Sequence, residues 1–242
     1  MKEKLNHWSI IVGLLVIIAG IVLIVCDIIY SWSASRIWSN VGCSMLASGL
    51  VILLNSLLVD RRIISPLDSW GIQNIYENRS LMNVDCDISN AKAKKKIDIV
   101  AFGLQSYRTS QGNNTLSLLQ KGVDIRIITM DPESSFVQQR ETEEGGVAGQ
   151  IKNTIEQLVE WAEKLNAEST NGKITIKGYS CMTLDFYWRV DGDIYVGPYW
   201  YKYPSQQTIS YKFTKGAGFD AYSEYFERLW SDPMIKTLVQ GK

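Results

Sequence analysis

Arginines, tyrosines and small polar side chains gather after predicted strands, and their types suit a phosphate and a flat ring. Strands are expected at 97–103 and 123–130 and in a hairpin around Asp191-Gly192. Ligands of open α/β sheets lie at the carboxyl ends of strands. A guanidinium pairs with phosphate, and a tyrosine ring stacks on a nucleobase. The sequence therefore predicts a nucleotide or phosphate site formed by Gln105, Ser106, Tyr107, Arg108, Asp131, Ser134, Gln139, Arg140, Tyr187, Arg189, Tyr199 and Tyr201.

A simpler interpretation of these residues stays open at this point. The tyrosines also fit half-buried strand positions, and the arginines also fit ion pairs with Glu141, Glu143 and Glu144. Equal numbers of basic and acidic residues, 25 of each, argue against a general polyanion binder but not against a local basic site.

Several kinds of chemistry are excluded by residue type. The single histidine, His7, precedes the first apolar run, so the soluble part has no Ser-His-Asp or Cys-His mechanism and no histidine-based phosphodiesterase chemistry. The four cysteines, Cys26, Cys43, Cys86 and Cys181, lack metal-ligand spacing. We expect free thiols in a reducing compartment, no metal site and no cofactor.

Two apolar runs, residues 8–29 and 37–59, are each long enough to cross a bilayer as a helix, for which about 20 residues suffice. The second run carries polar residues at spacings of four, four and seven, which place them on one helix face: Asn40, Ser44, Ser48 and Asn55. Such a stripe either hydrogen-bonds neighbouring helices or lines a pore. Asp27, repeated around a symmetric assembly, would add an anionic ring. Because two helices cannot enclose a pore, a channel requires a homo-oligomer, a tetramer or a similar assembly.

Positive charges predict how the runs are oriented. Lys2 and Lys4 precede the first run and Arg61 and Arg62 follow the second, whereas the connecting segment carries only Arg36. The positive-inside rule then places both termini and the following domain in the cytoplasm, with the connecting segment outside. Small residues in the connecting segment also allow a cleaved signal peptide, but the first run is long for one and a second run follows at once.

The predicted organisation is a transmembrane hairpin over 1–62 and one soluble domain over 63–242. The fold class is α/β, with a mixed sheet flanked by helices, because strand, helix and strand alternate at 97–130. We expect residues 105–114 to form a polar loop before a helix at 115–121. The remaining expected elements are helices at 81–96, 134–140, 151–165 and 219–230 and strands at 173–179, 183–190, 194–196 and 208–213.

The order of these elements, with the blocks "KGVDIRIITMDPES", "FVQQR" and "RVDGDIYVGPYWY", resembles phospholipase-D-like domains over about residues 70–231. It is most similar to half-sized, catalytically degenerate versions that serve as sensor modules in prokaryotic proteins. The active family carries a His-x-Lys-x4-Asp motif. With its aspartate placed at Asp191, Leu184 and Phe186 stand at the histidine and lysine positions; with the aspartate at Asp193, Phe186 and Trp188 do. The resemblance thus implies a fold that keeps the pocket without the attacking histidine.

The layout also resembles prokaryotic antiphage membrane effectors, in particular Hailong-type effectors, which respond to single-stranded DNA. This resemblance implies a ligand-gated membrane effector and no enzyme. A nucleotide or single-stranded nucleic-acid signal, made by a partner nucleotidyltransferase, would open an oligomeric ion channel or disrupt the membrane. Two other functions stay open: a membrane-tethered phosphodiesterase or lipid hydrolase that uses residues such as Asp185 or Asp191, and a passive membrane-anchored sensor or scaffold.

Overall fold

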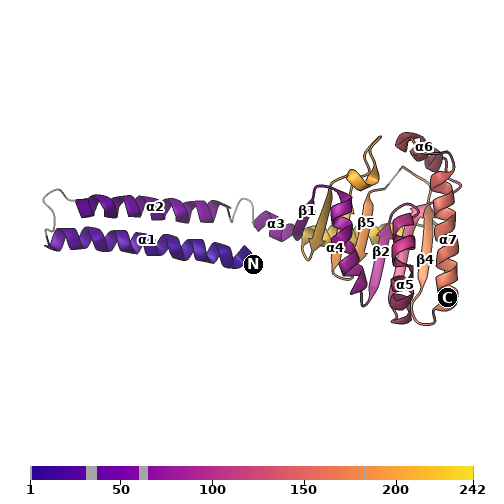
Figure 1. The fold of residues 1–242 in the computed structure, drawn as a ribbon, viewed down its shortest axis with the longest axis horizontal. Coiled ribbons are helices and arrows are strands. Elements are labelled where there is room, and N and C mark those ends of the chain that lie inside the picture. Colours follow the sequence, from indigo (N-terminus) through magenta and orange to yellow (C-terminus); the bar gives the residue numbers. More distant parts are fainter. Residues whose placement is uncertain (1, 31–36, 60–64, 183, 242) are drawn as a thin grey trace. The chain divides into compact units, whose positions relative to one another are not determined.

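The computed structural model describes residues 2–30, 37–59, 65–182 and 184–241. The chain divides into two compact units, Met1–Asp68 with the long apolar helices and Ser69–Lys242 with the sheet (Figure 1). The charges on which the predicted orientation rests lie outside the residues whose side chains are described: Lys2, Lys4, Arg36, Arg61 and Arg62.

Helices α1 (Lys2–Tyr30) and α2 (Ile37–Val59) each contain a stretch of 22 residues that is long and apolar enough to cross a membrane. They pack through glycines. A Cβ added to Gly20 would lie 2.7 Å from the carbonyl oxygen of Gly42, and one added to Gly49 would lie 2.9 Å from that of Gly13. Backbones approach this closely only where side chains are absent, so these four glycines form the contact inside the hairpin.

The polar stripe of α2, defined as Asn40, Ser44, Ser48 and Asn55, is exposed in the single chain. Its first three residues line an open groove of about 410 Å³. The contact between α1 and α2 therefore does not use the stripe. Hydrogen bonding to another protomer and pore lining both stay predictions.

Asp27 is buried, and its carboxylate accepts a hydrogen bond from the backbone N–H of Ser39 at 3.1 Å. Ser39 lies in the first turn of α2, where N–H groups have no partner within the helix and carry the positive end of the dipole. A ring of Asp27 carboxylates in a pore would require this carboxylate to leave the start of α2.

The second unit is built on a mixed sheet. Within the described residues eight strands form it, in the order β1-β7-β6-β5-β2-β3-β4-β8. The central strands β2, β3 and β4 run parallel, and the other neighbouring pairs are antiparallel. The strands are β1 (Ile72–Tyr76), β2 (Lys96–Val100), β3 (Asp124–Met130), β4 (Ile174–Tyr179), β5 (Phe186–Val190), β6 (Asp193–Gly197), β7 (Ser210–Thr214) and β8 (Lys236–Val239).

Helices cover both faces of this sheet. Helices α4 (Arg79–Ala91), α5 (Gln105–Gln120) and α7 (Gln150–Glu168) pack on one face, over Ile97 and Ile99 (Figure 1). Helix α8 (Ala217–Ser231) packs on the other face, over Val100 and Tyr187. Side chains alternate between faces along each strand, which is why neighbouring residues of β2 belong to different cores. The shorter helices are α3 (Ser65–Trp70), α6 (Ser135–Glu144) and the 3₁₀ turn η2 (Ser205–Gln207).

The predicted α/β fold class is confirmed, with two long apolar helices and a mixed sheet flanked by helices. The polar loop predicted at 105–114 is wrong, because α5 begins at Gln105. The first half of α5 has no apolar residues at helical spacing, so the sequence did not indicate a helix there. Its Thr109 and Ser110 donate their hydroxyls to helix carbonyls one turn earlier. The edge strands β1 and β8 were not predicted, since both are short and neither alternates clearly. The helix predicted at 81–96 ends earlier, at Ala91.

Candidate ligand-binding site

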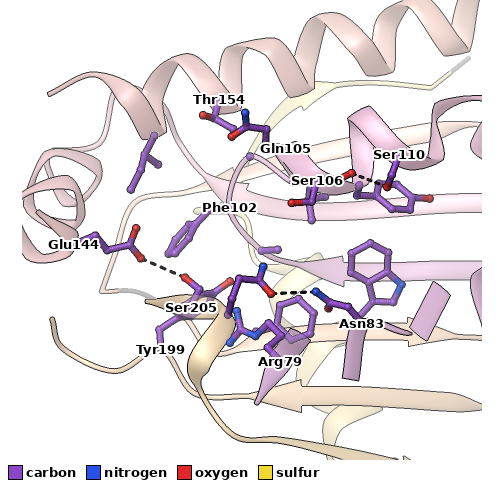
Figure 2. Close-up of a pocket in the computed structure, with 18 of the residues that line it drawn as sticks. Arg79, Asn83, Phe102, Gln105, Ser106, Ser110, Glu144, Thr154, Tyr199 and Ser205 are labelled. Atoms are coloured by element: carbon purple, nitrogen blue, oxygen red, sulfur yellow. Dashed lines mark hydrogen bonds between the residues drawn. The ribbon is translucent and has the colours of Figure 1, made fainter. Parts of the chain in front are cut away.

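A cavity of about 330 Å³ opens at the carboxyl end of β2 (Figure 2). It is lined by residues of helices α4, α5, α6 and α7, by the turns from β2 into α5 and from α6 into α7, by strand β5, and by the loop that leads from β6 to β7. Its polar and aromatic lining includes Arg79, Asn83, Asp87, Asn90, Phe102, Gln105, Ser106, Tyr107, Ser110, Glu144, Gln150, Thr154, Phe186, Trp188, Tyr199, Ser205 and Gln206.

Arg79 is the cation of this cavity and is only 3% exposed. Its guanidinium lies between two rings, with Cζ 4.3 Å from the centroid of Phe186 and 4.6 Å from that of Tyr199. One terminal nitrogen donates to the Pro198 carbonyl at 3.2 Å and to the Thr208 hydroxyl at 3.1 Å. Its Nε has no hydrogen-bond partner. Burial raises the pKa of the Asp185 carboxyl, and the positive charge of Arg79 opposes that rise, so a carboxylate lies near this guanidinium, whose hydrogen bonds go to other groups. A buried cation whose bonds go to neutral acceptors can still pair with an anion.

Arg140 lies behind the aromatic wall and is also 3% exposed. Its guanidinium lies near the rings of Tyr199 and Phe102, at 5.5 Å and 5.8 Å from their centroids. Unlike Arg79 it has a carboxylate partner, Glu144, and it donates to the Trp200 carbonyl at 3.4 Å. Tyr199 therefore sits between two guanidinium groups, which fixes its ring in the wall.

Two helix N-termini beside the cavity differ in whether a side chain caps them. The first turn of α7 is capped by the buried carboxylate of Glu141, which accepts hydrogen bonds from the N–H groups of Gly149, Ile151 and Lys152. The first turn of α5 has no side-chain cap, because its N-cap residue is Leu104, in the left-handed conformation. Residues 105–107 of that turn line the cavity. The positive end of α5 thus faces the cavity without an internal anion.

A glycine allows α5 to begin here. A Cβ added to Gly103 would lie 2.6 Å from the carbonyl carbon of Thr154, so the turn from β2 runs directly against α7. Any side chain at this position would push the turn away from the helix and change the mouth of the cavity.

Carboxamides and rings complete the lining. Asn83 donates to the side chain of Gln206 at 3.1 Å (Figure 2). The Trp188 indole donates to Asn90 at 2.9 Å. Ser205 donates to Glu144 at 3.3 Å, which ties the loop after β6 to α6. Amides that both donate and accept suit the edge of a nucleobase, and the rings suit its face.

Burial shifts the pKa values of several groups in the lining. It raises the pKa of the Cys86 thiol well above its usual range and that of the Tyr107 phenol to about 12. Burial also raises the pKa of the Asp87 carboxyl, and the charge of Asp87 raises the pKa of the Cys86 thiol further. Ser205 donates to Glu144, but Arg140 already pairs with that carboxylate.

Five of the twelve predicted residues come together at this site. Gln105, Ser106, Tyr107 and Tyr199 line the cavity, and Arg140 supports its aromatic wall. Tyr107 is buried and accepts a hydrogen bond from Thr115, so its ring forms part of the floor.

Five predicted residues lie outside the cavity and bond elsewhere. Arg108 donates to the Gly103 carbonyl and to Gln157. Asp131 accepts from the N–H of Glu133 and pairs with Lys236, and Ser134 caps α6. Gln139 bonds Glu143, and Tyr201 is 69% exposed.

The last two predicted residues lie on the other face of the sheet, which corrects the prediction. Tyr187 stacks on Phe226 of α8, with ring centroids 5.2 Å apart. Arg189 bonds Ser223 of the same helix. Strand residues alternate between faces, so Phe186 and Trp188 reach the cavity while Tyr187 and Arg189 do not. Asp191, considered for a non-standard phosphodiesterase, instead accepts the N–H groups of Lys94, Lys95 and Lys96.

Residues of α4 and β5 were missed by the sequence reasoning. Phe186 and Trp188 had a signal, because they stand at the positions that the phospholipase-D-like motif assigns to reactive groups. Arg79 and Asn83 had none, since they reach the cavity from a helix and not from a strand end.

Comparisons with known proteins find similarity in solved structures alone. No protein-family model matches the chain, and no curated protein matches it. One similar structure is TrmBL2, an archaeal chromatin protein with a novel mode of DNA binding, at a TM-score of 0.43 and 10% identity over 84% of this chain and 66% of that one. The chain thus spans slightly less than two thirds of that protein.

A second similar structure is NucT from Helicobacter pylori, at a TM-score of 0.42 and 10% identity over 68% of this chain and 97% of that one. Because both TM-scores lie below 0.5, function is argued below from this chain's own residues, and the likeness to phospholipase-D-like domains stays a prediction.

Proposed function

We propose that this chain is a ligand-gated membrane effector. Its soluble unit binds a nucleotide or a short single-stranded nucleic acid in the cavity, and binding changes an oligomer of hairpins that conducts ions or disrupts the membrane. The proposal places the chain in a prokaryotic inner membrane, with the soluble unit in the cytoplasm, where a partner nucleotidyltransferase supplies the signal during antiphage defence.

The observation that carries the ligand half of this proposal is the state of Arg79. Among the described residues its hydrogen bonds go to neutral acceptors, and Asp185 interacts with it only through charge, so a phosphate would supply the bonded anion that this buried guanidinium lacks. The nearby start of α5 adds N–H groups and a dipole of the same sign. A phosphate satisfies both groups at once.

The rest of the ligand is inferred from the walls. Phe102, Phe186, Trp188 and Tyr199 offer ring faces, and carboxamides stand between them. Inorganic phosphate would leave this surface unused, whereas a nucleotide places a base against the rings. We infer that the bound group is one nucleotide unit, free or at the end of a strand.

The membrane half of the proposal is supported by how the hairpin uses its residues. Glycines make the internal contact, so the polar stripe is left for neighbours. Asparagine and serine side chains facing lipid are costly, and other protomers or pore water would satisfy them. A symmetric oligomer around these stripes provides both. The ligand must then prefer one state of that oligomer, because equal affinity for two states shifts nothing.

A binding experiment tests the ligand half. The full chain, purified in detergent, is titrated with the four nucleoside 5′-monophosphates, with the matching nucleosides, and with 5′-phosphorylated ten-nucleotide strands of mixed sequence. We expect the phosphorylated ligands to bind and the nucleosides to bind at least about tenfold more weakly, since the charge-assisted bonds to phosphate are lost. Equal binding of nucleosides, or no binding by any probe, would reject a phosphate site.

A conductance experiment tests the membrane half. The full chain is reconstituted in vesicles, and ion flux is followed while the best-binding probe is added. Flux that changes with the probe and is lowered by the Ser44→Leu/Ser48→Leu variant supports the proposal. Binding without any change in flux would assign the chain to passive sensing.

A further inference from the structure

Helix α4 has an apolar face on its outer side as well as its inner one. Met82 and Cys86 are buried against the sheet. On the outer side Leu81, Val84 and Ile88 are 53%, 63% and 52% exposed. Their spacing of three and four residues aligns them on one side of the helix. These three residues form the α4 stripe, and surface residues aligned in this way mark a contact more than scattered ones do.

Charges at the two ends of α4 indicate what covers the stripe. Glu77 is exposed just before the helix and Lys92 is exposed just after it. In the sequence, the bond between Val84 and Asp85 lies midway between Glu77 and Lys92. It also lies midway between Leu81 and Ile88. An antiparallel copy of α4 therefore sets Leu81 against Ile88 and Glu77 against Lys92, twice. Self-complementarity of this kind is what a twofold axis requires.

We propose that the α4 stripe is a contact between two copies of this chain. The two α4 helices cross antiparallel at Val84, the apolar side chains meet in the centre, and a Glu77–Lys92 ion pair closes each end. The pairing depends on no ligand, but it rests on the membrane half of the proposed function, because the hairpins must hold the two copies in one bilayer.

The contact is weak by its size. Stable interfaces engage about 20–30 residues on each side, and the stripe offers far fewer. An exposed ion pair adds about 0–1 kcal/mol. Such a contact forms when another attachment raises the local concentration of the partner, and hairpins held in one bilayer supply that attachment. The soluble units of an assembly thus pair only when their hairpins hold them together.

The same helix connects this contact to the cavity. Arg79, Asn83 and Asp87 of α4 line the cavity, while the stripe faces outward. A ligand that shifts α4 would shift the paired surface with it. This connection rests on the ligand half of the proposed function, whereas the pairing rests only on the membrane half.

Cross-linking in the full chain tests the pairing. Cys26, Cys43 and Cys181 are replaced by serine, Val84 by cysteine, and the chain is placed in phosphatidylcholine vesicles with a short bis-maleimide. Cys86 stays, because it is buried and its thiol has a raised pKa. The matched control is Lys164→Cys on the exposed side of α7. We expect covalent dimer from Val84→Cys at about tenfold the yield of the control, since only one site is held near its copy.

Charge reversal provides the second arm. In the Val84→Cys background, Glu77→Lys or Lys92→Glu alone should lower the dimer yield about fivefold, because symmetry removes two exposed ion pairs at once. The two reversals together should restore it. Equal yields from Val84→Cys and Lys164→Cys, or a double reversal that fails to restore dimer, would overturn the pairing. No ligand is added, so these outcomes are independent of the nucleotide titration.

Discussion

Arginines lie against aromatic rings at both ends of the central strands, but the two ends differ in the groups that bond the guanidinium. At the amino ends, Arg126 of β3 bonds Asp98 at 2.6 Å and Glu227 at 2.6 and 2.9 Å, with Phe226 and Trp230 beneath it. At the carboxyl end of β2, Arg79 has rings, a carbonyl and a hydroxyl. Rings are common to both ends, so the carboxylates make the difference.

The same contrast extends to the backbone. At the amino ends Asp191 accepts three successive N–H groups, from Lys94 to Lys96. At the carboxyl end the first turn of α5 has no side-chain cap. The carboxyl end also has internal carboxylates, since Glu141 caps α7 and Glu144 pairs with Arg140. What this end leaves without a bonded carboxylate, among the described residues, is the guanidinium of Arg79 and the start of α5. A basic cluster is evidence for a ligand only after its internal partners have been counted.

The largest effect is expected at the internally paired end. Arg126→Met removes the cation that bonds Asp98 at 2.6 Å and leaves this fully buried carboxylate with Lys96 alone, at 3.5 Å. Breaking one partner of a buried pair costs about 3–5 kcal/mol, so the melting temperature of the soluble unit should fall sharply. The paired change Asp98→Leu/Arg126→Met should recover much of this loss. A double variant as unstable as the single one would show that the pair itself, not the orphaned charge, matters.

A smaller effect of a different kind is expected at the open end. Arg79→Met should weaken binding of a nucleoside 5′-monophosphate by roughly 10- to 100-fold, the value of a charge-assisted contact of about 1.5–3 kcal/mol. Its melting temperature should fall less than that of Arg126→Met, because the lost hydrogen bonds go to two neutral acceptors and Asp185 loses only an attraction through space. Arg189→Met is the matched control, since that arginine also bonds a carbonyl and a hydroxyl, those of Asp191 and Ser223, but on the other face of the sheet. Similar losses in both variants would remove Arg79 from the site.

Asp191 should affect stability without affecting binding. Asp191→Ala removes the acceptor of three N–H groups and places alanine at a φ of 49°, so we expect a loss of about 1 kcal/mol or slightly more. Asp191→Asn keeps an acceptor and tolerates the left-handed backbone, and should lose less. Denaturation midpoints and nucleotide titrations of both variants check this. A change in nucleotide affinity would connect the two ends of the sheet.

Much of the fold could be predicted because burial leaves a pattern in the sequence. Parallel strands buried on both faces read as continuous apolar runs, which fixed β2 and β3, and α7 repeats its apolar residues at helical spacing. The site was predicted where it follows strand ends, at Gln105, Ser106 and Tyr107.

The rest of the site depends on information that local pattern does not carry. On β5 the aromatic residues run without a polar alternation, so the face turned to the cavity cannot be read from the strand alone. The sequence reasoning chose Tyr187 and Arg189, and the register against β2 puts Phe186 and Trp188 there instead. Arg79 reaches the cavity from a helix through contacts more than 100 residues away along the chain. Only the folded sheet brings these segments together.

The smallest effect concerns pH, and it has opposite signs at the two ends. The hydrogen bond from Arg126 lowers the pKa of Glu227 below its ordinary 4.5, whereas burial raises the pKa of Asp87 above its ordinary 3.8. A carboxyl with a lowered folded-state pKa contributes stability above its unfolded pKa, and that stability is lost as pH falls through the folded value. A carboxyl with a raised pKa destabilises the fold when ionised, and protonation relieves this as pH falls.

Melting temperatures measured from pH 7 down to about pH 3 separate these contributions. Glu227→Gln should lower the melting temperature at pH 7 and flatten its decline below about pH 4.5, because the variant has already lost the ionised partner of Arg126. Asp87→Asn should raise the melting temperature at pH 7, and its advantage should vanish in acid. If both variants changed the acid limb in the same direction, the carboxylates at the two ends would be equivalent, and the argument that only one end waits for an external anion would fail.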